Sequence, residues 1–160
     1  MAVQAIPEGM HTLTPNLLHR DCARAIEFYR AAFGAQEIMR MPAPDGSTIW
    51  HAELRIGDSV LFMNDEMAGM AEKAPSPEQP SSVSLWLYVA DCDAAHRRAV
   101  AAGAKSTMEP QDMFWGDRTA SVSDPFGYRW SFATHVKDLT MDEMKRAGEE
   151  FARKMSAGPK

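Results

Sequence analysis

The chain has 160 residues, 45% of them hydrophobic, which is enough for one sizeable core and favours a single structural unit. A net charge of -5 disfavours nucleic acid as a partner, because phosphate binding needs a concentrated basic face. No apolar run reaches the roughly 18 residues of a membrane span. Residues 1–10 also lack the basic start and apolar core of a secretory signal. We therefore expect a cytoplasmic protein with no membrane partner and no nucleic-acid partner.

The first half of the chain predicts one strand, one helix and three further strands. Residues 12–19 have extended character, and Asp21 is a suitable cap for a helix over 22–33 that ends at Gly34. A strand is expected over 36–41. The next one, over 48–56, alternates polar and apolar residues, and Gly57-Asp58 turns the chain into a strand at 60–63.

Residues 65–82 change character, because prolines are mixed with Glu, Lys, Ser and Gln. This composition buries little apolar area, so we expect a mobile connector. The pattern then restarts with a strand over 83–89, a helix capped by Asp91 or Asp93, and a strand over 105–113.

Residues 116–132 read GDRTASVSDPFGYRWSF, in which two alternating runs flank an Asp-Pro-Phe-Gly turn. Proline presets one turn torsion and glycine supplies another, so this run predicts a hairpin. The hairpin completes a second βαβββ unit. Asp21-Cys22 recurs as Asp91-Cys92 and Gly57 recurs as Gly127, each 70 positions later (91 − 21 = 70; 127 − 57 = 70). Two copies of one unit, each with a helix on one sheet face, predict a cleft between the halves.

This duplicated pattern with its Asp-Pro-Phe-Gly hairpin resembles the vicinal oxygen chelate (VOC) superfamily of glyoxalases, bleomycin-resistance proteins and dioxygenases. The runs HAELRIGDS and FWGDR, together with the ATHV ending, resemble its PhnB-like branch. The resemblance implies an α+β fold in which two βαβββ repeats form a curved mixed sheet around a cleft. The expected domain covers 10–136, with repeats 10–64 and 83–136 joined by the linker 65–82. Residues 137–160 form a C-terminal helical extension.

Glyoxalase-like members hold a divalent metal with a His or Gln from the first strand and a Glu from the last strand of each half. Here those four places correspond to Thr14, Leu61, Ser84 and Ser131, none of which is a competent ligand. We therefore predict no metal and no cofactor. Alternation places these four residues in the cleft, where a small molecule could contact them, together with Asn16.

Two further groups of cleft residues carry possible functions. Trp86, Tyr88, Phe114 and Trp115 could clamp a flat ligand, or could simply pack in the core. His51 and Glu53 lie two apart on one strand, so they could act as a base with its orienting acid, bind an unusual metal, or form a solvated polar face. Arg118 beside Asp117 could orient a ligand or link the hairpin.

The tail predicts an amphipathic helix, because a capping box at Thr140 to Glu143 precedes apolar residues at helical spacing: Met144, Ala147, Phe151 and Met155. This helix could pack on its own domain or cover a partner in the homodimer that we expect.

Three functions remain open. The first is a metal-free protein of the bleomycin-resistance type that binds an aromatic or cationic small molecule. The second is a superfamily enzyme, such as a lyase, isomerase or dioxygenase, that uses His51 and Glu53 with or without a metal. The third is a non-catalytic interaction module.

Overall fold

A computed structural model describes residues 3–69 and 71–156 of the chain, except for the side chain of Met155. The elements, in chain order, are β1 (Asn16–His19), α1 (Cys22–Phe33), β2 (Gln36–Pro42), β3 (Ile49–Ile56), β4 (Ser59–Asp65), β5 (Ser84–Tyr88), α2 (Cys92–Ala101), β6 (Lys105–Asp112), β7 (Asp117–Ser123), β8 (Arg129–His135) and α3 (Met141–Ser156).

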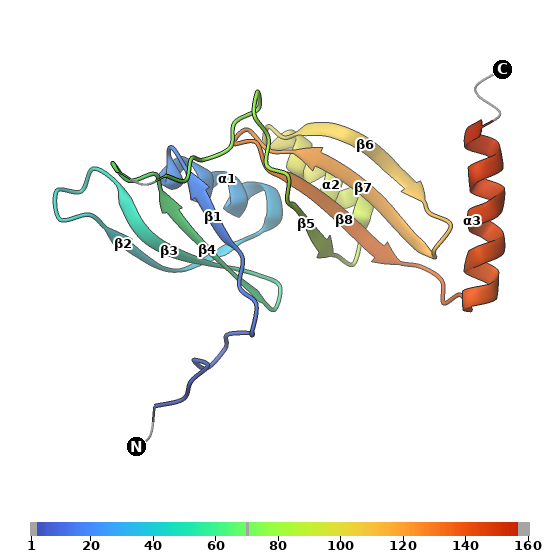
Figure 1. The fold of residues 1–160 in the computed structure, drawn as a ribbon, viewed down its shortest axis with the longest axis horizontal. Helices are drawn as coiled ribbons and strands as arrows, with labels where there is room; N and C mark the ends of the chain where they lie inside the picture. The colour runs from blue at the N-terminus through green and yellow to red at the C-terminus, as the bar shows by residue number, and fades with distance from the viewer. Residues whose placement is uncertain (1–2, 70, 157–160) are drawn as a thin grey trace.

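The predicted duplication is confirmed, since each half is a βαβββ unit whose strands form one mixed four-stranded sheet (Figure 1). The strand orders are β1-β4-β3-β2 and β5-β8-β7-β6, in which the first strand of each half runs parallel to the last. The N-cap carboxylates of Asp21 and Asp91 start the two helices, as their positions predicted. The first strand is shorter than expected: it begins after Pro15, which has no N–H to offer a ladder.

Each helix covers one face of its own sheet, and α1 and α2 also pack against each other. The core beneath them holds aromatic side chains from both halves, including Tyr29, Phe33, Trp130 and Phe132. Asp124, the first residue of the Asp-Pro-Phe-Gly turn, is buried there. Its Oδ2 accepts hydrogen bonds from Tyr29 Oη at 2.8 Å and Trp130 Nε1 at 2.9 Å. The turn therefore joins the second sheet to the helix of the first half.

The last strands of the two halves, β4 and β8, do not correspond at the 70-residue spacing that relates Gly57 to Gly127. The β3–β4 turn has two residues (57–58), whereas the β7–β8 turn has five (124–128). The backbone N–H of Cys22 donates to Asp65, and that of Cys92 donates to Thr134, so the last strands correspond at a spacing of 69 (134 − 65 = 69). A shift of one residue moves a strand side chain to the opposite face of the sheet.

This shift corrects the predicted place of Leu61. It lies opposite Leu54 in the β3–β4 ladder, and both side chains belong to the buried core beneath the helix. Phe62, the next residue of β4, lies on the other face, with its ring centroid 4.8 Å from that of His51. The structural counterpart of Ser131 in the first half is therefore Phe62.

The linker is not the freely mobile connector that its composition suggested, because its second part packs against the Asp-Pro-Phe-Gly turn. Ala74 and Ser76 are buried, and the Ser81 N–H donates to the carbonyl of Gly127 at 2.9 Å. Gly127 has φ +92°, and a Cβ there would lie 2.5 Å from the carbonyl oxygen of Ser76. A close approach of two backbones thus requires glycine at this turn.

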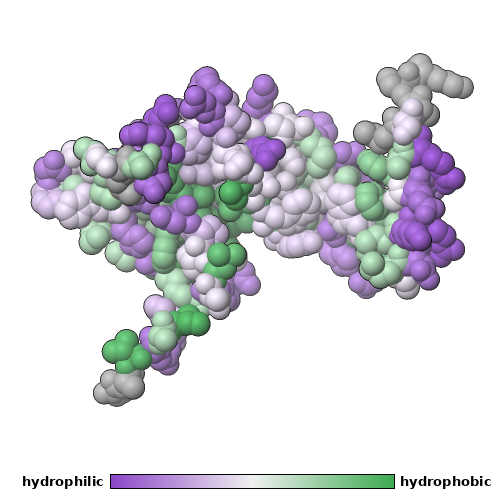
Figure 2. All heavy atoms as spheres, in the orientation of Figure 1, coloured by the Kyte–Doolittle hydropathy of each residue, from purple (hydrophilic) through white to green (hydrophobic). Residues whose placement is uncertain are grey.

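The C-terminal helix α3 forms as predicted, with the Thr140 and Glu143 side chains making the reciprocal capping contacts. Figure 1 places it at the end of the second sheet, beyond the β6–β7 turn. Figure 2 shows hydrophilic side chains on its outer side and more hydrophobic ones on the side facing the domain. Over residues 3–69 and 71–156, the helices do not combine the length and the apolar character that a membrane span requires.

Candidate functional site

The face of each sheet that carries no helix displays the candidate functional residues, and we call it the helix-free face. In the first half, His51 and Glu53 project from β3 on this face, as their alternation predicted. His51 Nε2 lies 3.1 Å from Glu53 Oε1, and the Glu53 side chain is only 15% exposed. The pair therefore forms a half-buried acid–imidazole contact beside the ring of Phe62.

In the second half, two aromatic side chains of β5 stand beside small hydroxyl residues on the helix-free face. Trp86 is level with Ser131, whose Oγ lies 2.9 Å from Ser121 Oγ on the next strand. Trp86 is 46% exposed and Tyr88 is 68% exposed, so both rings remain available to a ligand. Ser84, at the start of β5, is exposed on the same face.

The side chain of Asp117 forms a polar centre at the end of this face, although it is only 6% exposed. Its Oδ1 lies 2.7 Å from His135 Nδ1, and its Oδ2 accepts longer hydrogen bonds, both 3.2 Å, from Tyr88 Oη and Trp115 Nε1. The Asp117 carboxylate raises the pKa of His135 and, through its charge, that of Tyr88. Sequence reasoning missed this role of Asp117, although alternation from Ser121 could have placed it on this face.

A cavity of about 230 Å³ lies between the two halves, bounded by the β3–β4 turn, β5 and the segment before β1. Its walls are largely apolar. They include Thr14, Ile56, Val60, Leu61, Leu85 and Trp86. Thr14 and Trp86 thus meet at one cavity, and Leu61 reaches it from the core. Asn16 lies outside this cavity and lines a neighbouring one with the linker.

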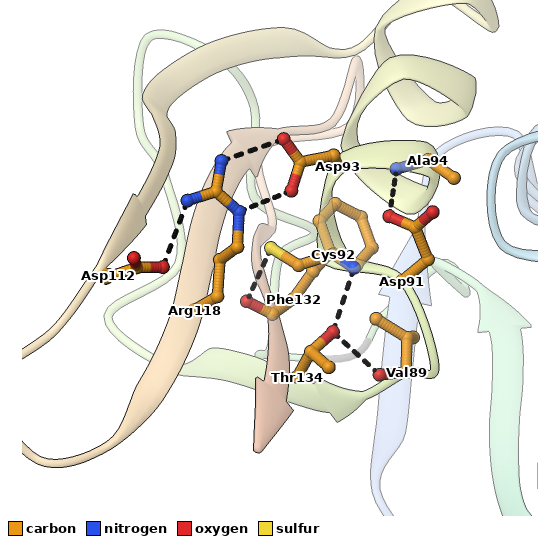
Figure 3. Close-up of polar contacts among 9 residues, drawn as sticks. All are labelled: Val89, Asp91, Cys92, Asp93, Ala94, Asp112, Arg118, Phe132 and Thr134. Atoms are coloured by element: carbon orange, nitrogen blue, oxygen red, sulfur yellow. Dashed lines mark hydrogen bonds and ion pairs between the residues drawn. The ribbon is translucent and has the colours of Figure 1, made fainter. Parts of the chain in front are cut away.

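Arg118 does not contribute to the helix-free face, so its contacts favour the predicted structural link over the predicted ligand-orienting role. Adjacent residues of a strand point to opposite faces, so Arg118 turns towards α2 while Asp117 turns away from it. Its guanidinium pairs with Asp93 and, at 3.0 Å, with Asp112 (Figure 3). Arg118 therefore links α2 to β6 and β7.

Phe114 is also displaced from its predicted site. Its ring packs against that of Phe151 in α3, with centroids 5.5 Å apart, and lies close to Gly148. The C-terminal helix thus covers Phe114, whereas its neighbour Trp115 turns back towards Asp117. Of the four aromatic residues predicted to clamp a ligand, Trp86, Tyr88 and Trp115 lie together.

Residues 10–132 match the profile of the Glyoxalase/Bleomycin resistance protein/Dioxygenase superfamily. The chain belongs to this superfamily. It is 40% identical over 150 residues to the uncharacterized protein Rv0887c of Mycobacterium tuberculosis, which covers 92% of this chain and 85% of that protein.

Solved structures of other proteins share this fold. TioX from Micromonospora sp. ML1 superposes with a TM-score of 0.63 at 28% identity, covering 79% of this chain and 99% of TioX. The fosfomycin resistance protein FosX from Listeria monocytogenes, solved with Mn(II) and sulfate, superposes with a TM-score of 0.59 at 13% identity, covering 83% and 95%. At that identity the likeness to FosX concerns the fold alone.

The residues at the superfamily's usual metal positions do not fit a divalent cation. With the corrected register, these positions hold Thr14, Phe62, Ser84 and Ser131. Three neutral hydroxyls and a phenyl ring offer neither imidazole nor carboxylate, and the Ser131 hydroxyl already pairs with Ser121. Over 3–69 and 71–156, no three or more His, Cys, Asp or Glu side chains are grouped so that they could hold a metal ion.

Proposed function

We propose that this superfamily member binds a small aromatic or cationic molecule without a metal, in the manner of a sequestering protein. One observation carries the proposal: Trp86 and Tyr88 stand half-exposed or more on the helix-free face, and Trp86 also lines the apolar cavity between the halves. Exposed aromatic surface next to an apolar cavity is typical of ligand sites. The donor set at the usual metal positions supports binding in place of metal chemistry.

A thermal-shift screen of planar drugs and metabolites tests this proposal. Compounds that raise the melting temperature of the wild type should lose that effect in Trp86→Ala. The matched control is Trp50→Ala, because Trp50 is 44% exposed but lies outside the cavity. Equal loss in both variants, or no hits with the wild type, would refute binding at this site.

We also propose that the protein acts as a homodimer, in which the helix-free faces of two copies enclose the ligand. The helix-free side of edge strand β2 exposes Met39 and Met41, and the segment before β1 exposes Leu13. Exposed apolar surface of this kind is typical of an interaction site. Light scattering at micromolar concentration should give twice the chain mass, and a monomer would contradict the proposal.

The alternative is an enzyme that uses His51 and Glu53, and the 3.1 Å contact between them favours it. A half-buried carboxylate can hold an imidazole in the orientation that a general base needs. Metal analysis after purification without added ions tests the metal-dependent form of this alternative. A stoichiometric divalent metal that is lost in His51→Ala would overturn the metal-free binder and support a metal-dependent enzyme.

A further inference from the structure

The two carboxylate oxygens of Asp117 make hydrogen bonds of unequal length. Its Oδ1 has a short, 2.7 Å contact with the imidazole of His135, whereas Oδ2 receives two neutral donors at 3.2 Å. Charge-assisted N–H bonds to a carboxylate are shorter, about 2.7–2.9 Å, and roughly twice as strong as neutral ones. A charged donor would therefore bind Oδ2 better than the phenol and the indole do.

A second, independent feature of the same face points to a missing partner. Thr119 lies two residues beyond Asp117 on β7 and projects from the same face, so the Cα atoms of the two residues are about 6.6 Å apart. It is fully buried, and its Oγ1 has no hydrogen-bond partner among the residues that the structure describes. Buried hydroxyls are almost always paired, so an orphan here calls for an explanation.

Tyr88 is placed to open and close this spot. The sheet register sets Tyr88, Ala133 and Thr119 in one row across β5, β8 and β7, while the Tyr88 hydroxyl reaches Asp117 in the next row. Its ring thus extends from the row of Thr119 towards that of Asp117. Tyr88 is also the more exposed of the two β5 aromatics, and its one side-chain hydrogen bond among the described residues is this 3.2 Å contact.

We propose that Asp117 Oδ2 and Thr119 Oγ1 form a subsite for the ammonium group of an organic cation. The ammonium displaces the Tyr88 hydroxyl from Oδ2, donates to the carboxylate, and donates a second hydrogen bond to the Thr119 hydroxyl. Trp86, in the neighbouring row, then lies next to the planar part of the ligand. This subsite rests on the proposed function and narrows its ligand class to molecules that join a planar apolar group to a primary or secondary amine.

Calorimetric titration with a matched pair of probes tests the subsite: 1-naphthylmethylamine, which is a cation at pH 7, and the neutral 1-naphthalenemethanol. The amine should bind wild type about tenfold more tightly than the alcohol. Asp117→Asn should abolish that preference. The control is Asp112→Asn, which removes a nearby carboxylate bonded to Arg118, away from the helix-free face, and should leave the preference intact.

Thr119→Val is a second variant, which should raise the stability of the free protein but weaken its preference for the amine. It removes a buried, unpaired hydroxyl at nearly constant volume, so the free protein should melt at a higher temperature. The amine preference should nevertheless fall several-fold. A residue with a purely structural role would not raise stability while weakening selectivity.

The outcomes separate this subsite from the broader function. Equal binding of the two probes, or an amine preference that survives both Asp117→Asn and Thr119→Val, overturns the ammonium subsite. Trp86-dependent binding of other planar compounds would then still support the proposed function. If neither probe binds, the subsite is also overturned.

Discussion

His19 should make the fold sensitive to mild acid. It is 1% exposed, and the rings of Tyr29, Phe126 and Tyr128 surround it. Within residues 3–69 and 71–156, neither of its ring nitrogens has a hydrogen-bond partner. Burial lowers its pKa from 6.5 to about 4, although the nearby charge of Asp21 opposes this shift. Between these two pH values the unfolded chain binds a proton that the folded protein excludes.

The sign and size of the effect follow from this difference in pKa. The stabilising contribution of neutral His19 is complete above pH 6.5 and is lost as the pH falls towards 4. One pKa unit corresponds to about 1.36 kcal/mol, so the loss should reach about 1 kcal/mol at pH 5.5 and about 2–3 kcal/mol at pH 4.5. Protonation below pH 4 adds nothing further from this residue.

Urea unfolding of wild type and His19→Phe between pH 7.5 and 4.5 measures this contribution. Phenylalanine fits an aromatic surrounding and cannot take up a proton, so the stability difference should shift in favour of the variant by about 2–3 kcal/mol as the pH falls. The exposed His11→Phe serves as the control and should show no such shift. A difference between wild type and His19→Phe that stays constant across this pH range would refute the reasoning.

Two further predictions concern the turns and caps. Gly57→Ala should lower the free energy of unfolding by about 1–2 kcal/mol because of its positive φ alone. Gly127→Ala should lower it clearly more, because the new Cβ meets the backbone of Ser76. Equal losses of stability in urea unfolding would contradict the packing of the linker on this turn. Thr134→Val removes the acceptor of the Cys92 N–H and should lower stability by about 1–2 kcal/mol. An unchanged thermal midpoint for Thr134→Val would show that water replaces Thr134 as the acceptor of the Cys92 N–H.

The overall fold could be predicted because its signals are local and occur twice. Asp21 and Asp91 cap the helices, and Gly57 and Gly127 mark the hairpins, so the two βαβββ units were visible in the spacing alone. The spacing did not show which face of the sheet each side chain of the last strand occupies, because the matching glycines lie in turns of different length. That difference put Leu61 in the core instead of at the ligand face.

The polar contacts of the site depend on partners distant in sequence. Nothing near Arg118 indicated that it would pair with Asp93 at the start of α2. The centre at Asp117 joins β5, the β6–β7 turn and the end of β8, which only the folded sheet brings together. The composition of the linker likewise could not show that Ser76 packs on Gly127.

We propose that the helix-free face binds its ligand without a metal. Titration calorimetry of a Trp86-dependent ligand, first in excess EDTA and then with added Mn²⁺, Ni²⁺ or Zn²⁺, tests it most directly. We predict the same Kd in every buffer. Binding that disappears in EDTA and returns with one of these ions would contradict it.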